Sequence, residues 1–561
     1  MNLPLLKLTR FASFVFLMLP LCLFSQNSEA NALATIPNSD TAQQPVPVWL
    51  ETPEDFTSNL PLLIVKTINN QSIWDSPKTD AYLGIVFNGG GEPNSFGGVH
   101  NHYSGSIGIE LRGNSTQGFP KKPYEFETRD SLGDNLNVSL FGWPEENDFI
   151  LRASYLDHTF IRNSLAMEMS RRTGRWASRC QLVELFVNDQ YMGIYVLMEK
   201  IKVDKGRLDI ANLDSSEIAE PDISGGYIFE ITGFGNQLGQ SRELKYPDFE
   251  EAAPEQIKYI SDYDNAFRNV MRSSFYKDEI LGYNAWIDVS SFVDELIVQE
   301  AMRNSDAYGW SGYFHKDKDE KLCAGPVWDF DQSAGNSSYP DNGVVSGWLF
   351  SHPQTSNTPF FWPLLFKDPV FAYKVRQRWE SLRDGPYKTD KLIAYIDSIA
   401  SDLADAQVRE FAKWPVLGVD FWRETTGYNQ RTTYQKEVDY LKTFLIARWA
   451  WMDTELSKIE NPDPTASISL TQSGVNNILV YPNPAADFLT FRFESPIVAD
   501  VTINIYNQVG MLLVSGQFDG AHNNSPITLS LQNIEAQGLY IYKVTIGGSE
   551  TFIGRFVKID R

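Results

Sequence analysis

The chain has 561 residues, of which 42% are hydrophobic and 13% are aromatic. Length and composition allow about two to four domains with packed cores. Charged residues make up 21% of the chain without a long run of one sign, a composition that is not typical of a disordered protein. The net charge of −23 argues against a nucleic-acid binder and against a polybasic membrane binder, although local basic clusters for an anionic ligand remain compatible with it.

Residues 1–26 are predicted to be an export signal. Lys7 and Arg10 form a positive region, and an apolar stretch follows at 11–24. This stretch is shorter than the roughly 20 apolar residues that a membrane-spanning helix needs. We therefore expect an exported protein with no transmembrane segment in the mature chain.

A polar, flexible segment at 27–45 precedes a region at 46–458 in which strands come first and helices follow. The pattern of apolar residues predicts strands, then a helix that begins near Asp157 as N-cap and ends at Gly174, then two strands joined by a tight turn at 188–190. The first four strands are expected near 60–67, 82–88, 106–113 and 123–128.

From residue 254 onward the pattern is mainly helical. A serine-capped helix is predicted at 290–304, and a long helix at 432–456. The apolar stripe of the long helix predicts core packing; it consists of Tyr434, Val438, Leu441, Leu445 and Met452. A linker rich in Pro, Ser and Thr follows at 459–475, and the short alternating runs of 476–561 predict a small β-sandwich.

Two carboxylates stand one residue apart in "VWDFDQSAGN", at Asp329 and Asp331. In a strand, residues i and i+2 point to the same face, so the two acids would project together. They repel each other unless a cation or a proton lies between them, and Mg²⁺ is commonly held by one or two carboxylates together with substrate phosphates. The alternative is that both acids cap backbone N–H groups of the following turn.

A third acid, Asp306, follows the 290–304 helix in "RNSDAYGWSGYF" and is a candidate catalytic residue or a simple turn residue. Upstream, "LRGNSTQGFPKKPYEFE" contains two glycines and then Lys121 and Lys122, a pattern that suits phosphate binding or an ordinary hairpin. Glu168, on the predicted helix after Asp157, could pair with one of these lysines or lie in solvent.

Other metal sites are less well supported by the pattern. Cys180 and Cys323 are too few for a zinc site, and they either form a disulfide or lie separately in the core. The stretch "HKDKDEK" lacks the ligand spacing of an EF-hand loop and predicts a polar hairpin turn in place of a Ca²⁺ site.

The order of these parts is that of protein kinases: glycine loop, lysine, helix with Glu, hairpin, catalytic Asp and metal-binding Asp. The motifs GxGxxG, His-Arg-Asp and Asp-Phe-Gly are absent. The chain resembles the spore-coat CotH kinase family, an atypical kinase-like group, over roughly 60–456. The resemblance rests on five stretches in order, "LRGNSTQGFPKKPYEF", "DHTFIRNSLAMEMSRRTG", "VELFVNDQYMGIYVLMEKIKVDKGRLDI", "QEAMRNSDAYGWSGYFHKD" and "GPVWDFDQSAGN".

The resemblance implies an α+β, two-lobed, atypical protein-kinase-like domain that transfers a phosphoryl group from ATP, with Mg²⁺ or Mn²⁺, to Ser or Thr of an unidentified protein. It implies Asp306 as the catalytic acid, Asp329 as the principal metal ligand with Asp331 beside it, and Lys122 on the nucleotide phosphates, with Lys121 as a near-equal candidate. Glu168 as the partner of that lysine is inferred from its helix position.

One departure from the family is Ser311, which stands where many members carry a second metal-binding Asn. It leaves a second hypothesis open, in which a catalytically silent kinase-like scaffold serves as a surface coat or adhesion protein.

The last part of the chain resembles the type A C-terminal sorting domain of type IX secretion. The resemblance rests on "VYPNPAADFLTF", "INIYNQVGMLL", "GLYIYKV" and "FVKI", in that order. It implies a secreted or surface protein that uses the type IX secretion machinery as a partner, with Tyr481, Pro482, Asn483 and Pro484 as part of an address and not as catalytic residues.

Overall fold

The computed structural model describes residues 55–462 and 478–559, except for gaps at 90, 114, 234–235, 240, 280, 354–357, 421, 494–498, 508–510, 520–525, 535–536 and 549. The predicted signal peptide, the segment at 27–45 and most of the predicted linker lie outside the described residues. Near the start of the described chain, β1 (Thr57–Ser58) and β4 (Asn94–Ser95) form a short antiparallel pair.

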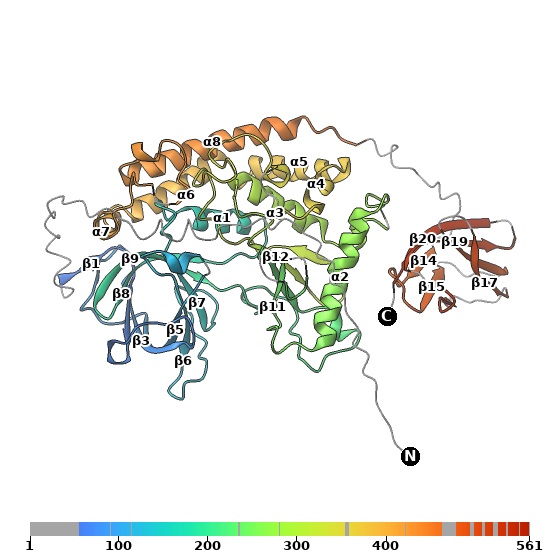
Figure 1. The fold of residues 1–561 in the computed structure, drawn as a ribbon, viewed down its shortest axis with the longest axis horizontal. Coiled ribbons are helices and arrows are strands. Elements are labelled where there is room, and N and C mark those ends of the chain that lie inside the picture. Colours follow the sequence, from blue (N-terminus) through green and yellow to red (C-terminus); the bar gives the residue numbers. More distant parts are fainter. Residues whose placement is uncertain are drawn as a thin grey trace, which may run out of the picture. The chain divides into compact units, whose positions relative to one another are not determined.

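The first lobe is a closed barrel of seven strands in the order β2-β3-β5-β6-β7-β9-β8 (Figure 1). Neighbouring strands are antiparallel except β2 and β8, whose parallel pairing, with Leu63 opposite Leu185, closes the barrel. The strands are β2 (Leu62–Thr67), β3 (Thr79–Val86), β5 (Tyr103–Leu111), β6 (Tyr124–Arg129), β7 (Asp148–Arg152), β8 (Cys180–Val187) and β9 (Gln190–Glu199).

Alternation along β9 explains how the barrel joins the rest of the domain. Tyr195 and Leu197 point into the barrel core, whereas Ile194, Val196 and Met198 belong to a second core on the outer side. Successive side chains of a strand point to opposite faces, so a strand that is buried on both faces carries apolar residues at nearly every position. The tight turn between β8 and β9 is confirmed, because Asn188 and Asp189 both adopt a left-handed conformation with φ of 51° and 63°.

The second lobe combines a four-stranded sheet with helices. The sheet has the order β11-β10-β12-β13, with strands β10 (Tyr227–Ile231), β11 (Arg242–Tyr246), β12 (Gly312–Lys316) and β13 (Leu322–Ala324). The hairpin from β12 to β13 contains the "HKDKDEK" stretch, as predicted. The helices share one large core with the sheet; they are α1 (Arg162–Arg172), α2 (Pro254–Arg272), α3 (Val289–Met302), α4 (Phe361–Phe366), α5 (Pro369–Asp384), α6 (Thr389–Asp402), α7 (Ala406–Lys413) and α8 (Tyr434–Ser457).

Two predicted helix starts are corrected. The helix expected at Asp157 begins at Arg162, although the Asp157 carboxylate still accepts the Arg162 N–H at 2.9 Å and the Thr159 N–H at 3.0 Å. Helix α3 is capped by Asp288, whose carboxylate accepts the Ser291 N–H at 2.6 Å, and not by a serine. A carboxylate is as good an N-cap acceptor as a hydroxyl, so residue type alone does not choose between adjacent candidates.

The long C-terminal helix of the second lobe confirms its predicted stripe. All five stripe residues of α8 are buried in the second core. Its first turn is capped by the hydroxyl of Thr433, which accepts the Lys436 N–H at 3.4 Å.

The tail forms two antiparallel sheets around a core of its own, which confirms the predicted β-sandwich. One sheet has the order β14-β15-β18 and the other β17-β16-β19-β20. The strands are β14 (Ile478–Tyr481), β15 (Phe488–Phe493), β16 (Val501–Tyr506), β17 (Leu512–Phe518), β18 (Ile527–Ser530), β19 (Gly538–Ile546) and β20 (Glu550–Lys558). No helix within the described residues is long and apolar enough to cross a membrane.

Candidate active site

Asp329 and Asp331 converge, but not by the route predicted from a strand. Strand β13 ends at Ala324, and the residues after it are irregular, with Asp329 in a left-handed conformation at φ 62°. A residue other than Gly seldom adopts this backbone conformation, so contacts with neighbouring residues must hold Asp329 in it. The contact that gathers the two acids is Arg152, the last residue of barrel strand β7.

One guanidinium nitrogen joins both carboxylates. Arg152 Nη1 donates to Asp329 Oδ1 and to Asp331 Oδ2, each at 2.6 Å. The side chains of Arg152 and Asp331 are 10% and 9% exposed, whereas that of Asp329 is 34% exposed. The ion pairs favour the charged form of the arginine and raise its pKa against the opposing effect of burial. Asp329 is therefore the member of the pair with a face open to a ligand.

Asn163, in the first turn of α1, holds the acids from the other side. Its Nδ2 donates to Asp331 Oδ1, and its Oδ1 accepts the Phe330 N–H at 2.9 Å. Burial raises the pKa of Asp331 to about 6, with Asp329 adding to the rise and Arg152 opposing it. Asp331 thus has both oxygens engaged and serves to position the loop as well as to carry charge.

Asp306 joins the acids through a short relay. Its N–H donates to Asn304 Oδ1 at 3.2 Å, and Asn304 Nδ2 donates to the Asp329 carbonyl at 3.1 Å. Burial and, next, the Asp329 carboxylate raise the pKa of Asp306 to about 7. Since like charges disfavour ionisation only at short range, the shift places Asp306 in the same electrostatic site as Asp329.

Ser311 also faces this site. Its hydroxyl donates to Asp329 Oδ2 at 3.4 Å, which is a long hydrogen bond. The residue that departs from the family pattern is therefore placed on the predicted metal ligand itself.

Arg112 and Arg152 lie against the ring of Trp328. Their guanidinium carbons are 5.7 and 5.5 Å from the ring centroid. Arg112 Nε forms an ion pair with Glu125 Oε2 at 3.6 Å. In the part of the chain that the structure describes, the Nε atom of Arg152 is buried and has no hydrogen-bond partner. A buried N–H without a partner costs free energy, and an anionic oxygen is the acceptor that a guanidinium binds best. The Nε donor of Arg152 suits a phosphate next to Asp329.

A metal ion at Asp329 and Asp331 would need further ligands. Across the described ranges, no group of three or more His, Cys, Asp or Glu side chains is arranged to hold a metal. Mg²⁺ tolerates this arrangement, because it takes one or two carboxylates and completes its octahedron with water and phosphate oxygens. The partly exposed Asp329 and its neighbour Asp331 therefore fit Mg²⁺ that arrives with a nucleotide.

The contacts described for the two lysines and for Glu168 do not include the three acids. Lys121 is fully buried, and its Nζ donates to Glu410 Oε1 at 2.7 Å and to the Ile194 carbonyl at 2.5 Å. Lys122 is half-buried and donates to the Gln117 carbonyl at 2.6 Å. Glu168 pairs with Arg171 and Arg172, each at 2.8 Å, and the contacts described for it do not include a lysine.

Sequence reasoning missed Arg152, Asn163, Asn304 and Arg112 as site residues. For Arg152 a signal was available: it follows the apolar run "DFIL" at the end of a strand. A charge placed in a buried strand needs a partner of opposite sign, although the sequence does not indicate which acid supplies it.

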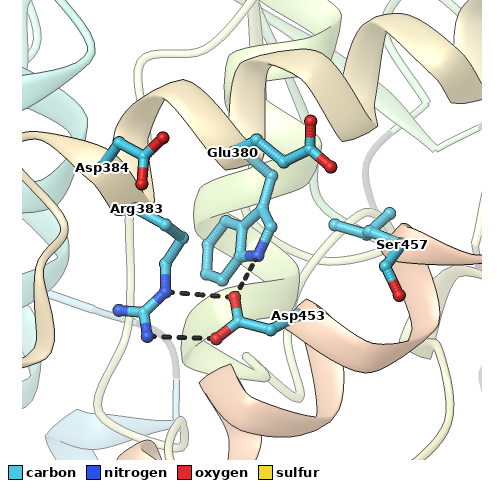
Figure 2. Close-up of a pocket in the computed structure, with 7 residues that line it drawn as sticks. Glu380, Arg383, Asp384, Asp453 and Ser457 are labelled. Carbon is cyan, nitrogen blue, oxygen red and sulfur yellow. Dashed lines mark hydrogen bonds and ion pairs between the residues drawn. The ribbon is translucent and has the colours of Figure 1, made fainter.

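The surface hollow shown in Figure 2 is separate from this site. It lies between α5 and α8, has a volume of about 450 Å³, and is lined by Trp379, Glu380, Arg383, Asp384, Asp453, Leu456 and Ser457. The Asp453 carboxylate accepts from Trp379 Nε1 at 2.7 Å and from Arg383 at 3.1 Å. The polar groups at its centre are thus paired with one another.

A barrel lobe and a helical lobe, with acids from the helical lobe gathered on an arginine of the barrel, define a kinase-like protein. Residues 109–452, more than half of the chain, match the family described as CotH kinase protein. The chain belongs to the CotH kinase family. Residues 479–558 match the secretion system C-terminal sorting domain, which supports secretion to the cell surface and contact with the secretion machinery.

No curated protein matches the chain. Solved structures match small parts of it. A DUF3244 family protein with an immunoglobulin-like β-sandwich fold from Bacteroides vulgatus is 25% identical over 15% of this chain and 84% of its own, with a TM-score of 0.13. Dimeric latent PorU from Porphyromonas gingivalis is 18% identical over 16% of this chain and 9% of its own, also with a TM-score of 0.13.

Proposed function

We propose that this secreted CotH-family protein transfers the terminal phosphoryl group of Mg²⁺-bound ATP to a Ser or Thr hydroxyl of a protein. The proposal rests above all on one observation: Asp329 and Asp331 meet on Arg152, whose buried Nε has no partner among the described residues. Such a site has carboxylates for a metal and a cationic donor for a phosphate side by side. Phosphoryl transfer depends mainly on this kind of positioning and charge compensation.

In this reaction the acceptor oxygen forms a bond to the γ-phosphorus, and the bond from that phosphorus to the bridging oxygen of ADP breaks. The electron pair of the broken bond leaves on ADP. Asp306 orients the acceptor hydroxyl and accepts its proton, and a pKa of about 7 suits a base that works near neutral pH. Asp306 must be ionised to do so.

The other residues bind and orient. Asp329, with Asp331 behind it, would hold Mg²⁺, which supplies positive charge to the phosphate oxygens. Arg152 donates to the phosphate chain through its Nε atom, which has no partner among the described residues. Asn304 keeps Asp306 and Asp329 at a constant separation, because it bonds to the backbone of both. Lys122 is the lysine more able to reach a nucleotide, since Lys121 is fully enclosed.

A silent scaffold is the second candidate, and two observations favour it. Arg152 already pairs with both acids without any ligand, as in a structural ion pair. Ser311 also offers only a weak hydroxyl where an amide oxygen would bind a second metal. On this reading the protein acts at the cell surface as a coat or adhesion protein.

The experiment is transfer of label from γ-labelled ATP by the mature chain, with Mg²⁺ or Mn²⁺ and with acidic and basic acceptor proteins. Asp306→Asn and Asp329→Asn should each abolish labelling while leaving the melting temperature within a few degrees of the wild type. Asp397→Asn is the matched control, because this surface acid pairs only with Lys442 among its described contacts. Absence of labelling together with no stabilisation by Mg²⁺-ATP would favour the scaffold.

We further infer that export begins with residues 1–26 as a cleaved signal. The charge and the length of the apolar stretch support this reading. Amino-terminal sequencing of the secreted protein is expected to start near residue 27, and a start at residue 1 would contradict it.

A further inference from the structure

A segment near the end of the second lobe approaches the candidate site and lies outside the five stretches that resemble the CotH family. Residues 422–431 precede α8 and are held by Arg431, which pairs with Glu437 at 3.1 Å and with Glu424 at 3.6 Å. Arg431 and Glu437 are buried. The segment therefore has a defined position on the start of α8.

The carbonyl oxygen of Arg423 accepts the Ser338 N–H at 2.7 Å. Ser338 lies at the end of the turn that follows the paired acids. Within this turn Asn336 Nδ2 donates to the Asp331 carbonyl at 2.7 Å. Ser305, next to Asp306, donates its hydroxyl to the Gln332 carbonyl at 2.8 Å. Arg423 is thus bonded to the same turn that carries Asp331 and fixes the Asp306 loop.

The guanidinium of Arg423 is held over aromatic rings and not by an acid. It lies 5.1 Å from the ring centroid of Tyr339 and 5.3 Å from that of Trp422. The residue is exposed, and no carboxylate pairs with it in the part of the chain that the structure describes. Arg152, by contrast, is committed to two acids. A guanidinium placed by stacking keeps its hydrogen-bond donors for a ligand.

Two further observations concern the position of Arg423. The positive charge of Arg423 favours the ionised form of Asp306 and opposes the rise of its pKa, an effect that requires the two groups to be near each other. Arg423 also has a left-handed backbone, with φ of 50°, which an arginine rarely adopts without surrounding contacts that hold it.

The same segment contacts the glycine loop. The rings of Trp422 and Phe119 meet edge to face with centroids 5.7 Å apart. Phe119 follows Gly118 in the loop predicted to bind phosphate. Residues 422–431 therefore contact both the loop expected over the nucleotide and the turn beside the acids.

We propose that Arg423 binds the terminal phosphate of the nucleotide next to Asp306, as a cation that the chain supplies from a segment just before α8. This inference rests on the proposed phosphoryl transfer and adds a residue to it. Arg423 would neutralise the charge that develops on the transferred group, while its stacking on Tyr339 and Trp422 keeps it in place before the nucleotide binds.

The test is binding of Mg²⁺-ATP and of inorganic tripolyphosphate to the full mature chain, measured by calorimetry, with labelling activity measured in parallel. Arg423→Ala should weaken tripolyphosphate binding by about tenfold or more, as expected for the loss of a charged hydrogen bond. Arg423→Lys should recover only part of the affinity, because an ammonium cannot form the paired donors of a guanidinium. Lys436→Ala, an exposed cation in the first turn of α8, is the control and should bind within about twofold of the wild type.

The outcomes separate this inference from the proposed function. If Arg423→Ala and Arg423→Gln both bind tripolyphosphate as the wild type does, Arg423 does not contact phosphate and the inference is overturned. If the wild type binds no polyphosphate, the inference is overturned as well. If binding falls in the variants but the wild type transfers no label, the phosphate contact stands and the transfer reaction fails.

Discussion

At the scale of single residues, the candidate site depends on how Arg152 compensates two acids. Asp331 is nearly enclosed and Asp329 is one-third exposed, so the cost of burying charge falls mainly on Asp331. A buried ion pair adds little net stability compared with apolar residues, but removing one partner leaves an uncompensated charge. Arg152 is therefore a residue that both the fold and the proposed chemistry require.

We expect Arg152→Met to lower the free energy of unfolding by about 3 kcal/mol, because Asp331 then remains buried without a counter-charge. Urea unfolding, followed by tryptophan fluorescence, measures the change. Asp331→Asn introduced into the same chain should restore a large part of the loss. A loss below about 0.5 kcal/mol, the range of ordinary surface substitutions, would show that the ion pairs are not what compensates these acids.

Lys121 and Lys122 are adjacent in the chain but differ in burial and in their partners. Lys121 is enclosed with Glu410, which also accepts the Ile194 N–H at 2.6 Å. This cluster ties α7 to strand β9. Gly193 makes room for it, because a Cβ at this position would lie 2.2 Å from Glu410 Oε2.

Lys121→Met is expected to cost about 3–5 kcal/mol of stability, since Glu410 would be left buried and unpaired. Lys122→Met should cost less than about 1 kcal/mol, because it removes one hydrogen bond at a half-buried position. Thermal unfolding of both variants, with Mg²⁺-ATP binding measured alongside, distinguishes them. Similar losses of stability in the two variants would contradict the assignment of Lys121 to structure.

At the scale of elements, α3 connects the core to the acids. Gln299 Nε2 donates to Glu295 Oε1 at 2.8 Å, and Asn304 Nδ2 donates to Gln299 Oε1 at 3.1 Å. The chain of amides therefore runs from the middle of α3 to Asn304, which bonds to Asp306 and Asp329. Burial raises the pKa of Glu295 to about 7, opposed by its hydrogen bond from Gln299.

This shift predicts a pH dependence of stability. Between the unfolded pKa of about 4.5 and the folded value of about 7, the folded chain holds a proton that the unfolded chain has released. Stability contributed by Glu295 is thus fully present below pH 4.5 and is lost as the pH rises to 7, by about 3 kcal/mol at about 1.4 kcal/mol for each pH unit.

Glu295→Gln should remove this loss, because a neutral amide replaces the carboxyl group at every pH. We expect the variant to be more stable than the wild type at pH 8 and similar to it at pH 5, as measured by urea unfolding at both values. An equal difference between the two proteins at both pH values would contradict a raised pKa at Glu295.

At the scale of the whole molecule, the three largest apolar cores of the described residues lie inside the barrel, between the helices and the second sheet, and inside the tail sandwich. The core of the tail contains residues of the tail alone, among them Leu489, Ile503 and Val544. A sorting domain that folds around its own core can direct export without the site residues of the two lobes.

Deleting residues 479–558 should stop the chain from reaching the cell surface and leave it inside the outer membrane. Immunoblots of surface, periplasmic and medium fractions from the producing cells measure this distribution. Asp306→Asn, which leaves the tail intact, is expected to be exported normally. Surface display of the deleted chain would contradict the role of the tail as an address.

The sequence by itself determined the strands, the long helices, the sandwich tail and the family, because these depend on local periodicity and on motifs of adjacent residues. It also singled out Asp306, Asp329 and Asp331 by residue type. Tertiary structure alone decided which cation meets these acids. Arg152 lies 177 and 179 positions before Asp329 and Asp331 in the chain, and no local pattern encodes a contact over that separation. Tertiary structure also paired Lys121 with Glu410, 289 positions away. A buried charge needs a partner of opposite sign, and the folded chain decides which residue lies close enough to be that partner.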